Sequence, residues 1–286
     1  MSTEEKILRR IANTLIMYSY HMTENGLLHG KTGAMLYLYL YAQHSGDEVC
    51  YDYAGELLDG LMKSASDAPS DFEDGAAGLG WCVTRLLRAD IVGGRPNGVL
   101  AGIDNRILEM MSRNMWSKSW NELIYCAGRL ADFKTEGSKG YSELILSFLE
   151  WQIKEKQQKL SDNRKRAVSH YLDSYDIAFG KSIRTDALRK LLDLSHVDTV
   201  WKPDEESTVT SDDIDDNRIK RYITSSIWSM ISGKLVSDTG PGIDELLDYV
   251  KRQQLGLSPD DLRLSDGLAG LGSILLNKEF TNYQNI

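Results

Sequence analysis

Apolar residues follow two different patterns along this chain. In the first pattern they recur on one side of a helix, as Ile7, Ile11 and Leu15 do near the start, which is the spacing of an amphipathic surface helix. In the second pattern an apolar run has no wide polar face, as in residues 35–42, and this is typical of a helix surrounded by other helices. The two patterns alternate and predict helical hairpins, each with one outer and one inner helix.

A glycine-containing loop stands directly before three of the apolar runs. The chain reads GLLHGKTGAMLYLYL in residues 26–40, DFEDGAAGLGWCVTRLL in residues 71–87 and LSDGLAGLGSILL in residues 264–276. Each stretch contains two glycines three residues apart, namely Gly30 and Gly33, Gly75 and Gly78, and Gly267 and Gly270. Glycine has no Cβ, so it permits sharp turns and close backbone contacts. We therefore expect three loops that turn abruptly into buried helices.

The spacing of these motifs predicts about six hairpins. Gly128, Gly180 and Gly233 stand at similar intervals between the second and third motifs, and amphipathic segments lie between them. Helical repeats of this size stack into arrays that can close. We predict an all-α fold, an α/α toroid of about six hairpins forming a single domain over residues 1–286. The Leu/Tyr alternation in residues 35–41 also fits a strand, but the other two motifs lack it and favour a helix.

Composition and charge narrow the class of protein. The chain has 286 residues, of which 42% are hydrophobic and 26% charged, as in an ordinary soluble globular protein. Its net charge of −9 and the lack of a basic stripe argue against binding to nucleic acid. The charged N-terminal residues and the amphipathic helices predict a cytoplasmic protein with no membrane span. An acidic loop is expected at residues 198–217, around Pro203.

The three glycine stretches resemble the repeat signature of lanthionine synthetase C-like proteins. That family consists of α/α toroids, and the glycine-loop signature is similar to that of other α/α toroids, including six-hairpin glycosidases. The resemblance implies a peptide substrate or partner protein. It also implies a zinc ion, held in the family's cyclases by two cysteines and one histidine, which activates a cysteine thiol of the peptide for addition to a dehydroamino acid. Zinc suits this chemistry because it lowers the pKa of a bound thiol.

The sequence departs from that family at the zinc ligands. The family's Trp-Cys-x-Gly loop is matched only by Tyr125, Cys126, Ala127 and Gly128, and no cysteine follows Cys126 to supply the Cys-His-Gly loop. The other two cysteines, Cys50 and Cys82, are far apart in the sequence. The chain thus has three cysteines in all, and an odd number of widely spaced cysteines indicates reduced thiols without a disulfide framework. We therefore expect no zinc and no other cofactor, and a peptide-binding or accessory protein in ribosomal peptide modification.

Polar residues of the glycine loops are the candidate catalytic groups. His29, Glu73, Asp74 and Asp266 stand beside the first glycine of a motif, and in a ring of hairpins these loops are expected to share one cavity. Carboxylates at this place can act as general acid and base, which favours the alternative function, a six-hairpin glycosidase-like carbohydrate hydrolase or lyase. Asp74 and Asp266 can instead be N-cap residues, and His29 can be bonded to the backbone.

Three tryptophans are candidates for binding a peptide or a sugar. Trp81 follows the second glycine motif, and Trp116 and Trp120 precede the apolar run that begins near Ile124. Aromatic rings line many ligand grooves, but an aromatic residue at helical spacing also packs in a core.

Overall fold

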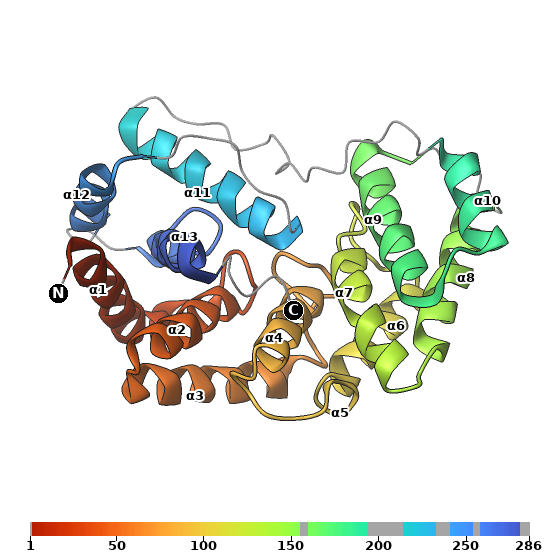
Figure 1. The fold of residues 1–286 in the computed structure, drawn as a ribbon, viewed down its shortest axis with the longest axis horizontal. Helices are drawn as coiled ribbons and strands as arrows, with labels where there is room; N and C mark the ends of the chain where they lie inside the picture. The colour runs from red at the N-terminus through yellow and green to blue at the C-terminus, as the bar shows by residue number, and fades with distance from the viewer. Residues whose placement is uncertain (1, 155–159, 194–213, 233–240, 254–257, 281–286) are drawn as a thin grey trace. The chain divides into compact units, whose positions relative to one another are not determined.

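A computed structural model describes residues 2–154, 160–193, 214–232, 241–253 and 258–280 of the chain (Figure 1). Every regular element in these ranges is helical, and the α-helices are numbered α1 to α13. The prediction of an all-α fold is confirmed, and residues 35–41 lie in a helix, α2, Lys31–Ser45. None of the helices in these ranges combines the length and the apolar character that crossing a membrane requires.

Contacts divide the chain into two compact units, Met1–Leu61 with Val200–Ile286, and Met62–Thr199. The prediction of a single domain stays a prediction. α3, Glu48–Ser64, contains the point of division.

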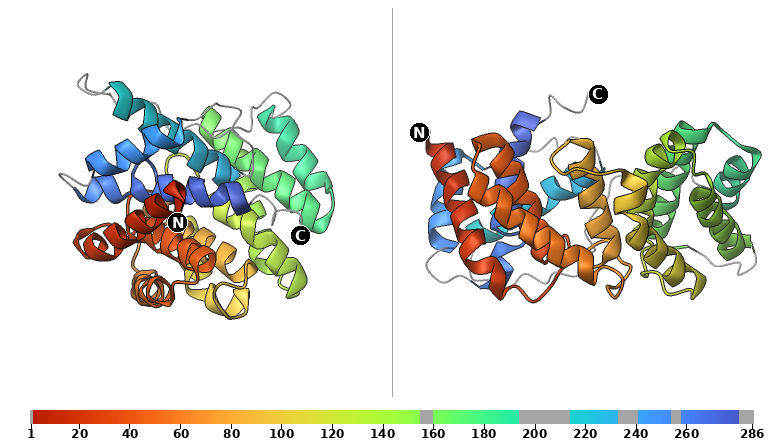
Figure 2. Two further views of the ribbon diagram at one scale, coloured as in Figure 1. Left: turned by 60° about the vertical axis from the view of Figure 1, so that its left-hand side comes forward. Right: turned by 90° about the horizontal axis from the view of Figure 1, so that it is seen from below.

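The first unit joins the beginning of the chain to its end. In this unit α13 packs against α1, α2 and α11, while α12 packs against α1 and α11 (Figures 1 and 2). The bounds of these helices are α1 Thr3–Tyr18, α2 Lys31–Ser45, α11 Ile214–Ser232, α12 Ile243–Gln253 and α13 Leu268–Phe280. The buried side chains of α13 and α2, among them Leu271, Leu275 and Leu38, form the core. The first and last hairpins are therefore neighbours in space.

The second unit is built around α7. This helix packs between α4 and α9, and the outer helices α6, α8 and α10 pack against α4, α7 and α9 respectively (Figures 1 and 2). The bounds are α4 Ala76–Arg88, α5 Pro96–Val99, α6 Ala101–Ser112, α7 Glu122–Thr135, α8 Gly140–Lys154, α9 Asp162–Phe179 and α10 Ile183–Leu192. Inner and outer helices thus alternate along the sequence, as the apolar pattern predicts.

The same close backbone contact precedes α2, α4 and α13. Gly30 and Gly75 are the N-cap residues of α2 and α4, both in extended conformation, and Gly267 directly precedes α13. A Cβ on any of the three would collide with the carbonyl group six residues upstream, which belongs to Glu24, Pro69 or Asp261. Only glycine fits such a contact. The three motifs are therefore one structural unit used three times.

The upstream carbonyls also accept hydrogen bonds from the first turn of the helix. The N–H of Lys31 donates to Glu24 (3.0 Å) and that of Ala76 donates to Pro69 (2.8 Å). First-turn N–H groups have no partner within their own helix. The loop supplies that partner from its own backbone, which explains why α2 and α4 begin without a side-chain cap.

Buried tyrosines tie three inner helices to the outer helices that precede them. Tyr37 of α2 donates to a carbonyl of α1 (2.7 Å), Tyr125 of α7 donates to Asp104 of α6 (2.6 Å), and Tyr171 of α9 donates to a carbonyl of α8 (3.0 Å). A buried hydroxyl is costly without such a partner. Each bond therefore fixes the depth at which the inner helix lies against its outer helix.

Gly128 and Gly180, which continue the interval of the glycine motifs, do not stand at the start of an inner helix. Gly128 lies inside α7, and Gly180 ends α9 with a φ of +87°. The inner helices α7 and α9 begin instead after Asn121 and Ser161, two polar N-cap residues. Gly233 lies outside the described residues. Polar residues stand at these two helix starts in place of the glycines, and of the two only Ser161 caps its helix with a side-chain hydrogen bond.

The predicted acidic loop at residues 198–217 lies mostly outside the described residues. Its last four residues are helical, because α11 begins at Ile214. Asp216, in the first turn of α11, pairs with Arg252 of α12 at 2.5 Å. Acidic residues are favoured near a helix N-terminus, where they complement the helix dipole.

We predict that Gly75→Ala destabilises the protein. The added Cβ would lie 2.7 Å from the carbonyl oxygen of Asp71 as well as on the carbonyl of Pro69. Forcing an atom into such tight packing costs about 1–3 kcal/mol. Urea unfolding followed by circular dichroism measures this change.

Gly60→Ala is the matched control. Gly60 lies within α3, and nothing approaches its Cβ position within 4 Å. Alanine should therefore stabilise this helix by up to about 1 kcal/mol. Equal stability changes in the two variants would contradict the special role of Gly75.

Candidate functional site

A buried carboxylate connects the loops that precede α4 and α7. Glu122 is the first residue of α7, and its side chain is fully buried. Its oxygens accept hydrogen bonds from Ser70 Oγ (2.8 Å), the backbone N–H of Ser117 (2.7 Å) and Ser117 Oγ (2.7 Å). Burial raises the pKa of the Glu122 carboxyl, and the hydrogen bonds oppose this shift without cancelling it. Glu122 therefore positions the two loops.

Asn121 precedes Glu122 and has unsatisfied hydrogen-bonding capacity. Its side chain makes no cap hydrogen bond, although it is the N-cap residue of α7. Its Nδ2 donates to Glu73 Oε1 across 3.5 Å, and its Oδ1 is buried with no hydrogen-bond partner in the described part of the chain. A buried polar atom without a partner costs about 1–3 kcal/mol. The Oδ1 atom is thus an acceptor for a donor that the described residues do not supply.

Glu73 and Asp74 lie in the loop before α4 and are both partly exposed. The N–H of Asp74 donates to Asp71 Oδ1 at 2.7 Å, so Asp71 supplies the carboxylate that stabilises this turn. The interpretation of Asp74 as an N-cap residue is wrong, because the N-cap of α4 is Gly75. The loop therefore presents carboxylates beside Asn121.

The other two candidate residues, His29 and Asp266, lie in the first unit, on loops that contact each other. The carbonyl of Leu28 accepts hydrogen bonds from the N–H groups of Leu264 and Ser265, each at 3.0 Å. These residues adjoin His29 and Asp266, which are both partly exposed. α13 begins at Leu268, so the residue before its first turn is Gly267, not Asp266. The first and third glycine loops are thus brought together; the cavity shared by all four residues stays a prediction.

Trp81 packs in the core of the second unit. It is 6% exposed, its ring meets Phe72 edge-on at 5.9 Å, and the guanidinium of Arg85 lies 4.4 Å above it. Its environment is that of a packing residue.

Trp116 and Trp120 lie in the loop before α7. Both rings pack near Phe148 of α8, at 5.1 Å and 6.3 Å between ring centroids. Trp120 is buried and has a φ of +57°, which is uncommon for a large side chain. The guanidinium of Arg164 lies 4.9 Å from its ring. Trp116 is partly exposed. These contacts hold the loop that carries Asn121.

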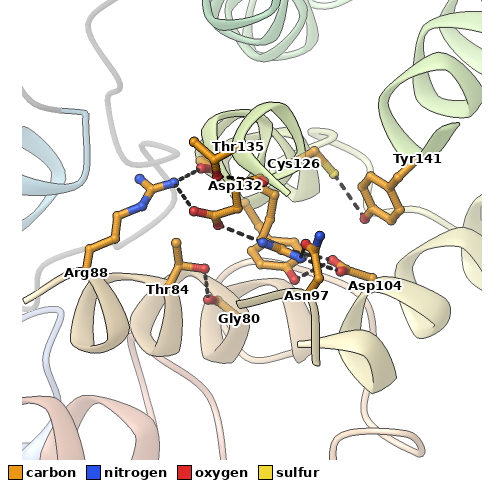
Figure 3. A network of polar contacts seen from close by, with 12 residues as sticks. Gly80, Thr84, Arg88, Asn97, Asp104, Cys126, Asp132, Thr135 and Tyr141 are labelled. Atoms are coloured by element: carbon orange, nitrogen blue, oxygen red, sulfur yellow. Dashed lines mark hydrogen bonds and ion pairs between the residues drawn. The ribbon is translucent and has the colours of Figure 1, made fainter. Parts of the chain in front are cut away.

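A second buried polar cluster lies toward the other end of α7 (Figure 3). The fully buried Arg129 pairs with Asp104 of α6 (2.8 Å) and with Asp132 (2.6 Å), and Arg88 of α4 also reaches Asp132 (3.0 Å). Asn97 accepts a further hydrogen bond from Arg129 at 2.9 Å. Removing one partner from a buried pair of this kind costs about 3–5 kcal/mol. Its groups bond one another, so this cluster is structural.

The cysteines do not belong to a cluster of possible metal ligands within the described ranges. Cys50, Cys82 and Cys126 are buried, and all three are free thiols. Burial raises the pKa of the Cys50 thiol to about 11 and raises those of Cys82 and Cys126 further. Among the described residues no three histidine, cysteine or acidic side chains are grouped so that they could hold a metal ion.

Sequence reasoning missed Asn121 and Glu122. The available signal is an N-cap signature, Asn followed by an acidic first-turn residue directly before the apolar run LIYCA. That signature predicts the start of a helix, but it does not show that Ser70 and Ser117 enclose the carboxylate.

Comparisons with known proteins give no relative for this chain. No family model, curated protein or solved structure matches it significantly.

We predict that Glu122→Gln changes how stability depends on pH. The pKa of Glu122 is raised in the folded protein, so its contribution to the free energy of unfolding is fully present below the unfolded pKa. This contribution is lost as pH rises through the folded pKa. The variant should therefore gain stability relative to the wild type as pH rises from 4 to 8, measured by urea unfolding.

Glu143→Gln is the control with the opposite sign. The hydrogen bond from Tyr175, with Lys139 and Arg184 nearby, lowers the pKa of Glu143. Its contribution is present above the unfolded pKa and lost as pH falls through the folded pKa. This variant should lose stability relative to the wild type as pH rises. A Glu122→Gln profile parallel to that of the wild type would contradict the assigned burial.

Proposed function

We propose that this chain is a zinc-less peptide-binding or accessory protein in ribosomal peptide modification, built as an α/α toroid similar to the lanthionine synthetase C-like proteins. The observation that carries the proposal is the set of hydrogen-bond acceptors at the start of α4 and α7, Glu73 Oε1 and the unpartnered Asn121 Oδ1. A peptide presents many N–H donors, so it complements such a site.

Two features of the first unit support a toroid. Leu28 accepts hydrogen bonds from the loop before α13, and the Cα of Gly272 approaches the ring of Tyr37 so closely that a Cβ there would overlap it. Contact between the first and last inner helices is what a closed ring of hairpins requires. A toroid would also place α2 beside α4 and α9 beside α11.

The arrangement of possible metal ligands supports binding without zinc chemistry. A cyclase of the resembled family holds its metal with two cysteines and one histidine, whereas no three histidine, cysteine or acidic side chains are grouped in this way in the described part of the chain. The environment of Glu122 does not favour the alternative function, a carbohydrate hydrolase. Its buried carboxylate already accepts hydrogen bonds from three donors, so it is poorly placed to protonate a sugar.

We expect Glu73→Gln to weaken peptide binding by a few-fold and to leave the fold unchanged. The neutral amide keeps one acceptor oxygen but loses the charge that strengthens a hydrogen bond. The measurement is binding of the labelled protein to an array of 15-residue peptides of varied composition. Glu136→Gln, an exposed position after α7, is the matched control and should bind as the wild type does.

A parallel assay of reducing ends released from mixed oligosaccharides tests the hydrolase alternative. A general acid or base contributes about 10²–10⁴-fold to a rate. Sugar release that Glu73→Gln reduces by this factor, with no peptide bound by the wild type, would overturn the proposed function.

A further inference from the structure

We propose that Asn121 Oδ1 and Glu73 bind a primary ammonium group of the peptide, from a lysine side chain or a free N-terminus; this inference rests on the proposed function. Asn121 is 7% exposed, and its Oδ1 lacks a partner in the described part of the chain. Glu73, in contact with the same amide group, is partly exposed. The pair therefore combines a buried neutral acceptor with a charged acceptor nearer to solvent.

The orientation of the Asn121 amide is fixed by its neighbour. If oxygen and nitrogen were exchanged, Oδ1 would face the Glu73 carboxylate, which offers only acceptors. The orientation with Nδ2 toward Glu73 is therefore the favourable one, and the oxygen is the atom without a partner. The ligand group at this atom must be a donor.

The local charge selects a cationic donor. Asp71, Glu73 and Asp74 lie within four consecutive residues, and Glu122 lies beside Asn121. Arg106 approaches this loop through a bond to the carbonyl of Ala68, and it also pairs with Glu109 at 3.0 Å. The N-termini of α4 and α7 favour an anion, whereas Asp71, Glu73 and Asp74 in the loop before α4 favour a cation.

The geometry favours ammonium over guanidinium. The contact between Asn121 Nδ2 and Glu73 Oε1 is 3.5 Å, at the limit of a hydrogen bond. An ammonium group offers three donors at one compact centre, which can bond an amide oxygen and a carboxylate together, whereas the planar guanidinium suits bidentate pairing.

Isothermal titration calorimetry at low salt tests this inference with three short peptides, two of which carry a free amino group and one of which carries none. The probes are acetyl-Gly-Lys-Gly-amide, the same peptide acetylated on Nζ, and Gly-Gly-Gly-amide with a free N-terminus. We expect one or both of the amines to bind and the doubly blocked peptide to bind at least about tenfold more weakly, the order expected for a lost charge-assisted hydrogen bond. The two amines distinguish the lysine source from the N-terminal source.

Variants separate a binding role from a structural one. Glu73→Gln and Asn121→Ala should each weaken amine binding by about tenfold, while Asn121→Ala should not lower the urea midpoint, because it removes an unsatisfied buried oxygen. Loss of stability in Asn121→Ala with unchanged amine binding would overturn the inference.

The remaining outcomes are also decisive. Equal binding of blocked and free peptides, insensitive to Glu73→Gln, would overturn the ammonium site and leave peptide binding standing. Preference for the acidic peptide acetyl-Gly-Glu-Gly-amide would show an anion site at the helix N-termini and would likewise overturn the inference. Failure of these probes together with the whole peptide array would overturn the proposed function itself.

Discussion

The close contact between a glycine and the carbonyl six residues before it determines how α2, α4 and α13 begin. At Gly30, Gly75 and Gly267 the contact leaves no room for a Cβ. It also directs an upstream carbonyl at the first turn of α2 and α4, whose N–H groups would otherwise be buried without partners. The inner helices can therefore begin inside the protein, and their apolar surfaces can be covered on all sides.

The two ends of α7 have different roles. At its C-terminal end Arg129, Asp104 and Asp132 neutralise one another in the interior and link α6 to α7, while Arg88 adds α4. At its N-terminal end Glu122 is satisfied by serines, but its neighbour Asn121 has an oxygen without a partner in the described residues. At the C-terminal end all the named polar groups are hydrogen-bonded, and they hold the helices in place. At the N-terminal end the Asn121 oxygen could accept a hydrogen bond from a ligand.

The sequence predicts the helices well and the site poorly, for physical reasons. The glycine motifs mark the starts of α2, α4 and α13 in the sequence, because any residue with a Cβ would collide with the backbone at Gly30, Gly75 and Gly267. The N-cap residues of α7 and α9 are Asn121 and Ser161, and only Ser161 makes a side-chain cap hydrogen bond, so the glycine spacing does not carry over to these two helix starts. The role of Glu122 depends on Ser70, fifty-two residues away, and a contact of that kind has no local signature.

The proposal that the repeated hairpins close into a ring is tested by distances between pairs of spin labels. One pair is placed at Gln43→Cys of α2 and Ala89→Cys at the end of α4. The other pair is placed at Ile177→Cys of α9 and Ser225→Cys of α11, and all four positions are exposed. Neighbouring helices pack at about 8–10 Å between axes, so a ring predicts a single short distance for each pair. A long or broad distribution at either pair, with helical content unchanged, would contradict the ring.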